Sequence, residues 1–474
     1  MAKYTEYGYD IQDGKAIIPE WETEITEEAF KDRKELTSVE FPQWIKKIGK
    51  DAFRGCSNLT EITLPEWVEE IGEYAFCGCK NIKSIDLPRW VTKIGWHAFS
   101  GCSSLTSIIV SKDNKFYDSR EDCNAIIHTE SNTLIRGCEN TIIPPSVTEI
   151  RKNAFSDCSS LTSITIPTSV TEIGGAAFAG CSSLTSIVIP PSVTEIVGGA
   201  FWGCSSLTRI SIPPSVTKIG KDAFRNCSSL TSITIPPSVT EIGEGAFSGC
   251  SSLTSISIPP SVTEIGNWAF AWCSSLTNIS VSKDNKVYDS REECNAIIHT
   301  ESNTLISGCE NTIIPPSVTK IGDAAFSGCK SLTRISIPPS VTEIGEYAFF
   351  GCSSLTSIFI PPSVTKIGIS AFSYCINLTN ITIPVSVTEI GEGAFSGCSC
   401  LTNITIPESV TKIEEGAFSR CSSLTSITIP ESVTEIREWT FSHCSSLTEV
   451  RIPKGCYVHG SAFWNCPKVK IIRY

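Results

Sequence analysis

A phenylalanine recurs every 23 residues along almost the whole chain, and this period constrains the fold more than any other feature. The spacing is broken only by two steps of 56 residues and a last step of 22. A fixed period of this length is typical of repeat architectures, in which each unit buries its apolar face only against its neighbours. The seventeen landmark residues are Phe30, Phe53, Phe76, Phe99, Phe155, Phe178, Phe201, Phe224, Phe247, Phe270, Phe326, Phe349, Phe372, Phe395, Phe418, Phe441 and Phe463.

Each repeat predicts one coil of a β-rich stack. In the repeat 230–252, alternating apolar residues predict a short strand over 231–235, and the following Pro236 trims it because proline lacks the N–H of a sheet ladder. A second short alternating piece follows, and the segment GAFSGC predicts a helical or 3-10 turn. The expected core residues of this coil are Leu230, Ile233, Ile235, Val239, Ile242, Ala246, Phe247 and Cys250.

Glycine follows the second isoleucine in many coils, for example at Gly72 and Gly220. Val197 and Arg151 fill the same slot in other coils, and a β-branched residue is poorly tolerated at positive φ. We therefore expect an ordinary negative φ at this slot, with glycine chosen for close packing.

Each step of 56 residues is one repeat plus an insertion of 33 residues, at about 111–143 and 282–314. The segments 110–143 and 281–314 are copies that differ only at Phe116/Val287, Asp122/Glu293 and Arg136/Ser307. Within each copy, AIIHT and TLI flank ESN and predict a hairpin. The insertions either serve the architecture alone or carry binding residues, as long loops often do.

The consensus L-x-x-I-x-I-P-x-x-V-x-x-I-G-x-x-A-F-x-x-C resembles the 23-residue leucine-rich repeat of the BspA-like group, over residues 18 to 474. The resemblance implies a leucine-rich-repeat solenoid of about 17 coils, with short parallel strands and short helical or 3-10 turns. We expect an N-terminal cap at residues 1–24 and a single solenoid over 25–474. The group is known from surface and secreted proteins of anaerobic bacteria and parasitic protists, so the resemblance also implies adhesion and protein binding.

Sixteen of the 23 cysteines lie three residues after a landmark phenylalanine, from Cys56 to Cys466, and predict a column of small buried side chains. Bonds along the column are disfavoured, because equivalent side chains point in parallel about 4.8 Å apart. One pairing stays open, a bridge from Cys123 to Cys138 with Cys294 to Cys309 as its copy. We expect no metal site, because the Cys-x-Cys pairs have no histidine or second pair at zinc spacing.

The net charge of -12 argues against a nucleic-acid partner, and no apolar run is long enough for a membrane span. No constellation of nucleophile and base stands out, so we expect no enzyme and no cofactor; a hydrolase within the insertions is the alternative from another class. The start of the chain shows no apolar signal region, which predicts a cytoplasmic protein, with a cell-surface or secreted one as the alternative. We expect a monomer, or a weak edge-to-edge dimer through the last strand, where Lys468, Lys470 and Arg473 lie.

Two sets of exposed residues are candidates for partner binding. The first four coils carry tryptophan two residues after the proline, where most units have serine, and four stacked indoles predict a platform for a protein or glycan ligand. The alternative is that they shield the first coils. The second set consists of residues on the outward strand face that differ from the short polar residues found there in most coils. The candidates are Trp21, Trp44, Trp67, Trp90, Arg209, Arg334, Phe359 and Arg451. The sequence thus predicts a non-enzymatic recognition scaffold, or alternatively a BspA-like surface adhesin that binds host or neighbouring-cell proteins.

Overall fold

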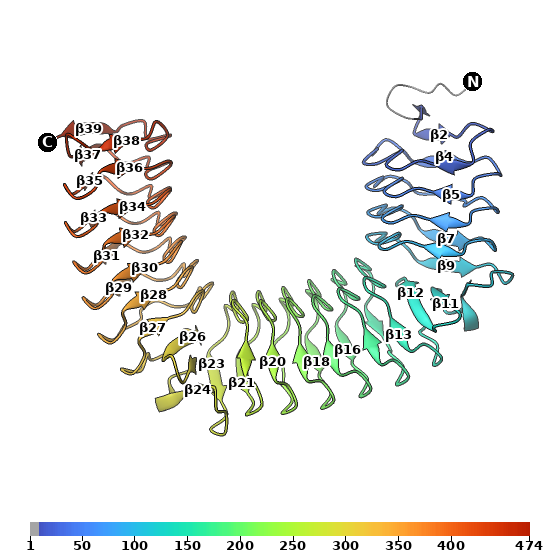
Figure 1. Ribbon diagram of the computed structural model, residues 1–474, viewed down its shortest axis with the longest axis horizontal. Coiled ribbons are helices and arrows are strands. Elements are labelled where there is room, and N and C mark those ends of the chain that lie inside the picture. Colours follow the sequence, from blue (N-terminus) through green and yellow to red (C-terminus); the bar gives the residue numbers. More distant parts are fainter. Residues whose placement is uncertain (1–8) are drawn as a thin grey trace. The chain divides into compact units, whose positions relative to one another are not determined.

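The computed structural model describes residues 9–474, which form short strands joined by turns (Figure 1). The chain divides between Leu230 and Thr231 into two compact units, and each is described by itself below. The expected N-terminal cap, residues 1–24, lies partly outside the described residues. Its described part is a hairpin of β1 (Ile11–Gln12) and β2 (Lys15–Ile17), and β2 pairs in parallel with β4 (Ser38–Glu40) of the next coil.

In the first unit, each regular coil contributes up to two short strands, one before the proline and one after it. The strands before the proline are β2, β4, β7 (Ser84–Leu87), β14 (Ser163–Ile164), β16 (Ser186–Val188) and β18 (Arg209–Ser211), and β9 (Ser107–Val110) takes the equivalent place ahead of the first insertion. Those after it are β3 (Glu24–Ile25), β5 (Lys47–Ile48), β6 (Glu70–Ile71), β8 (Lys93–Ile94), β13 (Glu149–Ile150), β15 (Glu172–Ile173), β17 (Glu195–Ile196) and β19 (Lys218–Ile219).

The second unit repeats this arrangement. Its strands before the proline are β21 (Ser255–Ile258), β23 (Asn278–Val281), β29 (Ser357–Phe359), β31 (Asn380–Thr382), β33 (Asn403–Thr405), β35 (Ser426–Thr428) and β37 (Glu449–Ile452), followed by the last strand β39 (Lys470–Arg473). Those after it are β20 (Glu241–Ile242), β22 (Glu264–Ile265), β27 (Lys320–Ile321), β28 (Glu343–Ile344), β30 (Lys366–Ile367), β32 (Glu389–Ile390), β34 (Lys412–Ile413), β36 (Glu435–Ile436) and β38 (Tyr457–Val458).

Neighbouring coils pair in parallel with a shift of one repeat. Ser186 pairs with Arg209 and Ile187 with Ile210, so equivalent residues form columns along each unit. The strand predicted over 231–235 is wrong, since these residues join no ladder, yet Ile233 and Ile235 are buried as expected. A ladder of two to four residues adds little, and burial of the alternate side chains sets the register instead.

The landmark phenylalanines form the centre of the core in both units. Successive rings stack in parallel with centroids 5.0 to 5.6 Å apart in the first unit and 5.1 to 5.6 Å apart in the second. All eight core residues predicted for the coil 230–252 are buried. The prediction of a stacked leucine-rich-repeat core is therefore confirmed.

The corner that carries each phenylalanine is a series of turns. Successive i to i+3 hydrogen bonds hold it, such as Arg54 N–H to the Asp51 carbonyl and Cys56 N–H to the Phe53 carbonyl, both 3.1 Å. This is the 3-10 bonding pattern, but between residues 9 and 474 regular 3-10 helix occurs only in the insertions, at η1 (Arg120–Asp122) and η2 (Arg291–Glu293).

The glycine slot confirms the packing argument. Gly72 has no positive φ, and a Cβ at this position would lie 2.7 Å from the backbone of Gly49 in the preceding coil. The slot therefore selects glycine because two backbones approach closely there.

The insertions form the predicted hairpins. In the first, β11 (Ala125–His128) pairs antiparallel with β12 (Thr133–Gly137), and β10 (Tyr117–Asp118) pairs with β11. The second repeats them as β24 (Tyr288–Asp289), β25 (Ala296–His299) and β26 (Thr304–Gly308). β12 and β26 then pair in parallel with β13 and β27, so each insertion ends in the ladder of the regular coils.

Candidate functional site

The four tryptophans of the first coils lie in the turns that follow β2, β4, the coil of residues 59–64 and β7. Their exposed fractions are 71% for Trp21, 56% for Trp44, 38% for Trp67 and 43% for Trp90. Trp67 and Trp90 stack with ring centroids 5.8 Å apart and planes 8° apart. The tryptophan column, as we call these four residues, therefore presents large apolar area to solvent, and this exposure argues against the shielding alternative.

Twelve later coils have serine at the equivalent position, and in nine of them the side chain has the same structural task. Each of these nine hydroxyls donates to the carbonyl of a valine in the preceding coil, over 2.5 to 2.8 Å. The serines are Ser169, Ser192, Ser215, Ser261, Ser340, Ser363, Ser386, Ser409 and Ser432. Tryptophan has no hydroxyl to make this bond, so the tryptophan column gives up a repeated stabilising contact of about 1 kcal/mol per coil.

A groove of about 500 Å³ runs beside the column. Trp67 and the half-buried Phe41 supply its aromatic wall, and Phe41 packs edge-on against the core ring of Phe53 at 6.0 Å. The outward strand residues Glu40 and Glu61 supply carboxylates on the other side. The groove thus joins apolar area to hydrogen-bond acceptors, as recognition sites commonly do.

Ion pairs surround the groove. Lys15 pairs with Glu40 at 2.5 Å, and Arg89 pairs with Glu66 at 2.9 Å while its guanidinium lies 5.1 Å from the Trp90 ring centre. The paired side chains are mostly exposed, so each pair contributes at most about 1 kcal/mol. Their role is to set the local charge rather than to hold the coils together.

The strand-face candidates lie on the outward side of the coils, as expected. Arg209 is exposed on β18 of the first unit. In the second unit, Arg334 is exposed, Phe359 on β29 is 65% exposed, and Arg451 on β37 is exposed with its guanidinium 5.9 Å from the Tyr474 ring centre. The structure places these four residues in two units, and their part in binding stays a prediction.

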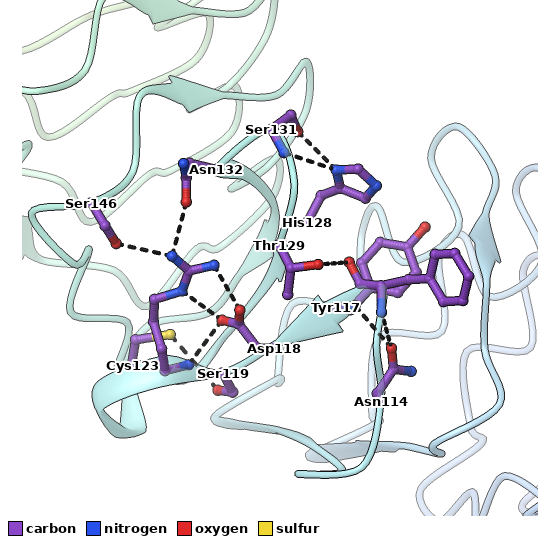
Figure 2. Close-up of polar contacts among 12 residues, drawn as sticks. Asn114, Tyr117, Asp118, Ser119, Cys123, His128, Thr129, Ser131, Asn132 and Ser146 are labelled. Atoms are coloured by element: carbon purple, nitrogen blue, oxygen red, sulfur yellow. Dashed lines mark hydrogen bonds and ion pairs between the residues drawn. The ribbon is translucent and has the colours of Figure 1, made fainter.

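The polar residues of the first insertion are largely engaged with one another (Figure 2). Asp118 accepts two hydrogen bonds from the Arg120 guanidinium, which also donates to Asn132 and Ser146. Asn114 donates to the carbonyls of Pro88 and Val91 and accepts from two backbone N–H groups. Asn114 thus donates to a valine carbonyl, as the nine serines of the later coils do. This network favours the architectural role of the insertions.

The cysteine column is buried and makes repeated backbone contacts. Thirteen of its thiols donate to the carbonyl of a landmark phenylalanine one coil back, over 2.9 to 3.3 Å. Burial raises the pKa of Cys204 and Cys375 to about 12, so these thiols are protonated and unreactive at neutral pH.

The structure answers the open question whether Cys123 is bridged to Cys138, and Cys294 to Cys309. Cys123, Cys138, Cys294 and Cys309 are free thiols. Cys138 donates to the Asn124 carbonyl at 3.5 Å, and Cys309 donates to the Asn295 carbonyl at the same distance. The hairpin therefore holds these sulfurs by backbone contacts rather than by a bridge.

Within residues 9–474, no three side chains of histidine, cysteine, aspartate or glutamate gather where they could hold a metal ion. In this range no helix combines the length and the apolar character that crossing a membrane requires.

Sequence reasoning missed the groove beside the column. Phe41 occupies a slot whose side chains point inward in other coils, so the repeat pattern predicts a core residue there. The pattern also does not distinguish Glu40 and Glu61 from the other charged residues of the chain. The signal that could have found the groove is the replacement of serine or threonine by glutamate on the strand face of these coils.

Comparison with known proteins gives a consistent picture. The family described as "BspA type Leucine rich repeat region (6 copies)" matches residues 23–129, 127–241, 194–300, 298–399 and 365–474. No curated protein matches the chain.

Two solved structures illustrate the likeness. A leucine-rich repeat protein from Eubacterium ventriosum is 28% identical, with a TM-score of 0.58 over 65% of this chain and 83% of that one. A leucine rich cell surface protein from Faecalibacterium prausnitzii is 27% identical, with a TM-score of 0.47 over 95% of this chain and 94% of that one.

Proposed function

Since the chain belongs to the BspA-type leucine-rich repeat family, we propose that it is a non-enzymatic recognition scaffold that binds a protein partner through the tryptophan column and the groove beside it. Repeat proteins of this kind commonly use extended faces for binding, because each coil adds one position to a continuous surface.

The single observation that carries the proposal is the exchange of serine for exposed tryptophan. In nine coils the serine bonds to the neighbouring coil, whereas the four tryptophans forgo this bond and leave 38% to 71% of each side chain in water. Neither change adds to stability. Tryptophan is, by contrast, the residue type most enriched among those that dominate binding energy at interfaces.

The groove supports a protein partner. Its aromatic wall of Trp67 and Phe41 offers a place for an apolar side chain, and the carboxylates of Glu40 and Glu61 offer acceptors for backbone or basic groups. A glycan would use the same indoles by stacking, and it is one outcome of the test below.

The adhesin alternative uses the same binding surface and differs only in placing the protein at the cell surface. A protein of the cell surface would meet host or neighbouring-cell proteins, and a cytoplasmic one would meet an internal partner. Fractionating the native cells and probing with an antibody against the chain separates these two proposals.

The test compares three proteins in the same pull-down from cell extract and on the same immobilised glycans. They are the wild type, the double variant Trp44→Ser with Trp67→Ser, and the control Trp202→Ser, which removes a tryptophan that is 50% exposed outside the column. We expect the wild type and the control to retain the same partner, and the double variant to lose it by about 100-fold or more in affinity.

Two results would overturn the proposal. Equal retention by the double variant would show that the column does not bind the partner. A melting temperature several degrees lower in the double variant would show that the column serves stability. Retention on glycans alone would replace the protein partner by a sugar.

A further inference from the structure

The two insertions differ at Arg136 and Ser307, and this difference opens a cavity in the second unit. The space around Ser307 measures about 160 Å³, whereas its counterpart around Arg136 measures about 20 Å³. The flanking hairpins have the same strands and the same bulge, so the backbone frame is shared. The difference in volume therefore comes from the side chains.

Three exchanges enlarge the space, although Trp268 of the second site replaces the smaller His97 of the first. Arg136, Arg151 and Asn153 of the first site correspond to Ser307, Gly322 and Ala324 of the second, since the copies are 171 residues apart. Each exchange replaces a long or branched polar side chain by a small one. The cavity is thus the volume that two guanidinium groups and an amide occupy in the first unit.

The first site shows how this frame holds a guanidinium. Arg136 is 3% exposed, and one of its terminal nitrogens donates to the carbonyls of Asn153 at 3.3 Å and Ser156 at 3.1 Å, while the other contacts the Cys158 sulfur at 3.6 Å. The guanidinium of Arg151 lies 4.1 Å from the Trp96 ring centre. The first site therefore offers both carbonyl acceptors and an aromatic face to a planar cation. In the second unit Asn267 stands in place of Trp96, and Trp268 stands in place of His97.

The second site keeps the equivalent backbone. The equivalent carbonyls belong to Ala324, which lines the cavity, and to Ser327, which already accepts the Trp272 N–H at 2.8 Å. The equivalent sulfur of Cys329 lies 3.7 Å from the Gly308 carbonyl, the distance that Cys158 has to Gly137. The Ser327 hydroxyl is 2% exposed and has no hydrogen-bond partner among residues 9–474.

The charges around the cavity favour a cation. The first site is lined by Arg136, Arg151 and Lys152, and Asp323 replaces the lysine in the second. Asp323 is exposed at the mouth, and in the described part of the chain it has no ion pair. Lys320 also lines the cavity, and it pairs at 3.2 Å with Glu343, which Lys366 also contacts at 3.4 Å. Trp268 adds an aromatic wall, and its ring lies 4.9 Å from that of Tyr347.

We propose that the cavity at Ser307 binds a guanidinium group, in the place that arginine side chains hold in the first insertion. The group comes either from a free small guanidinium compound or from an arginine side chain of a protein partner. In both cases Asp323 attracts the charge, Trp268 covers the plane of the cation, and the carbonyl frame around Ala324 accepts its N–H groups. The site is independent of the tryptophan column.

The test is calorimetric titration of the full chain with methylguanidinium chloride, with methylammonium chloride as the control cation. We expect saturable binding of methylguanidinium with a Kd of roughly 1 mM, as few contacting atoms allow, and at least tenfold weaker binding of methylammonium. Absence of saturable binding would mean that the cavity holds only water, and it would overturn the proposal.

Two variants locate the binding. Ser307→Arg restores the residue of the first insertion and should abolish binding, because its side chain fills the cavity. Asp323→Asn keeps the acceptor that bonds to the Glu346 N–H at 3.0 Å, so it should fold normally and weaken binding about tenfold. Unchanged binding in either folded variant would contradict the site.

A second titration separates the two sources. The tripeptide acetyl-Gly-Arg-Gly-amide presents the same group on a peptide backbone. Tenfold tighter binding of the tripeptide than of methylguanidinium would support an arginine side chain of a protein partner, and equal binding would support a free guanidinium compound. Binding of methylguanidinium without any binding of the tripeptide would restrict the cavity to small molecules.

Discussion

The first four coils and the later coils have the same kind of interior but differ in one outward turn. Phe53 in a tryptophan coil and Phe349 in a serine coil are both fully buried and stack on rings on both sides at 5.0 to 5.2 Å. The turn after the proline, in contrast, holds exposed Trp44 in one region and hydrogen-bonded Ser363 in the other. The core is therefore interchangeable between coils, and the outer positions are where coils acquire separate tasks.

The strongest check of this comparison is truncation of the shared core. Phe53→Ala and Phe349→Ala should each lower the free energy of unfolding by about 3–5 kcal/mol, because each leaves a cavity in a stacked column. Denaturant unfolding of both variants measures the loss. A cost much smaller for Phe53 would break the comparison, since it would mean that the tryptophan coils have a looser interior.

The buried thiols extend through both regions and predict a common pH dependence. Burial raises the pKa of Cys102 and of Cys375 to about 12. The unfolded chain releases these protons near pH 9 and the folded chain near pH 12, so stability is full below pH 9 and falls between pH 9 and 12. At pH 10 the loss is about 1.4 kcal/mol per thiol.

The variant Cys375→Ala tests this effect. It should show a smaller fall in unfolding free energy from pH 8 to pH 10 than the wild type, by about 1.4 kcal/mol. Urea titrations at the two pH values measure the difference, and Cys102→Ala provides the same reading in a tryptophan coil. Parallel pH dependences of variant and wild type would argue against buried, protonated thiols.

The serine contact predicts a smaller effect. Ser363→Ala removes the hydroxyl that donates to the Val341 carbonyl at 2.6 Å and should cost about 1 kcal/mol. Thermal unfolding measures this loss. Thr365→Ala is a matched control on the same coil, whose hydroxyl makes a longer, exposed bond of 3.3 Å to Thr342 and should cost less.

The smallest effect is expected at the tryptophan column itself. Trp67→Ser loses the stacking on Trp90 but gains a hydroxyl that can donate to the preceding coil, as the serines of later coils do. The net change in unfolding free energy should therefore stay within about 0.5 kcal/mol. The same unfolding experiment sharpens the comparison. A loss of several kcal/mol would make the tryptophans structural and remove the basis for a binding role.

Much of the fold could be predicted because the period carries it. The 23-residue spacing places Phe178, Cys181 and Val170 in the same slots as their neighbours, and all three are buried. The hairpins of the insertions followed from local alternation and turn residues. The helical turn at the corner did not form as a regular helix, since hydrogen bonds between adjacent coils compete for its backbone groups, as in Tyr74 N–H to the Trp96 carbonyl at 2.9 Å.

The candidate site was only partly predictable. The change from serine to tryptophan is visible in the sequence, but the partner of the serine hydroxyl lies 22 residues away in the preceding coil. The groove beside Trp67 depends on side chains from three coils. Such features need the closed structure, because no single repeat contains them.

The repeat, the inward side chains and the family follow from the amino-acid pattern alone, because periodic apolar residues can be buried in only one stacked arrangement. Which backbone residues are left-handed depends instead on how the coils pack. Tyr74 and Ala176 have φ of 54° and 53°, although neither is glycine, because each is held by one hydrogen bond to the following coil and one within its turn. Only the tertiary structure likewise showed the cavity at Ser307, since its volume depends on small residues brought together from separate coils.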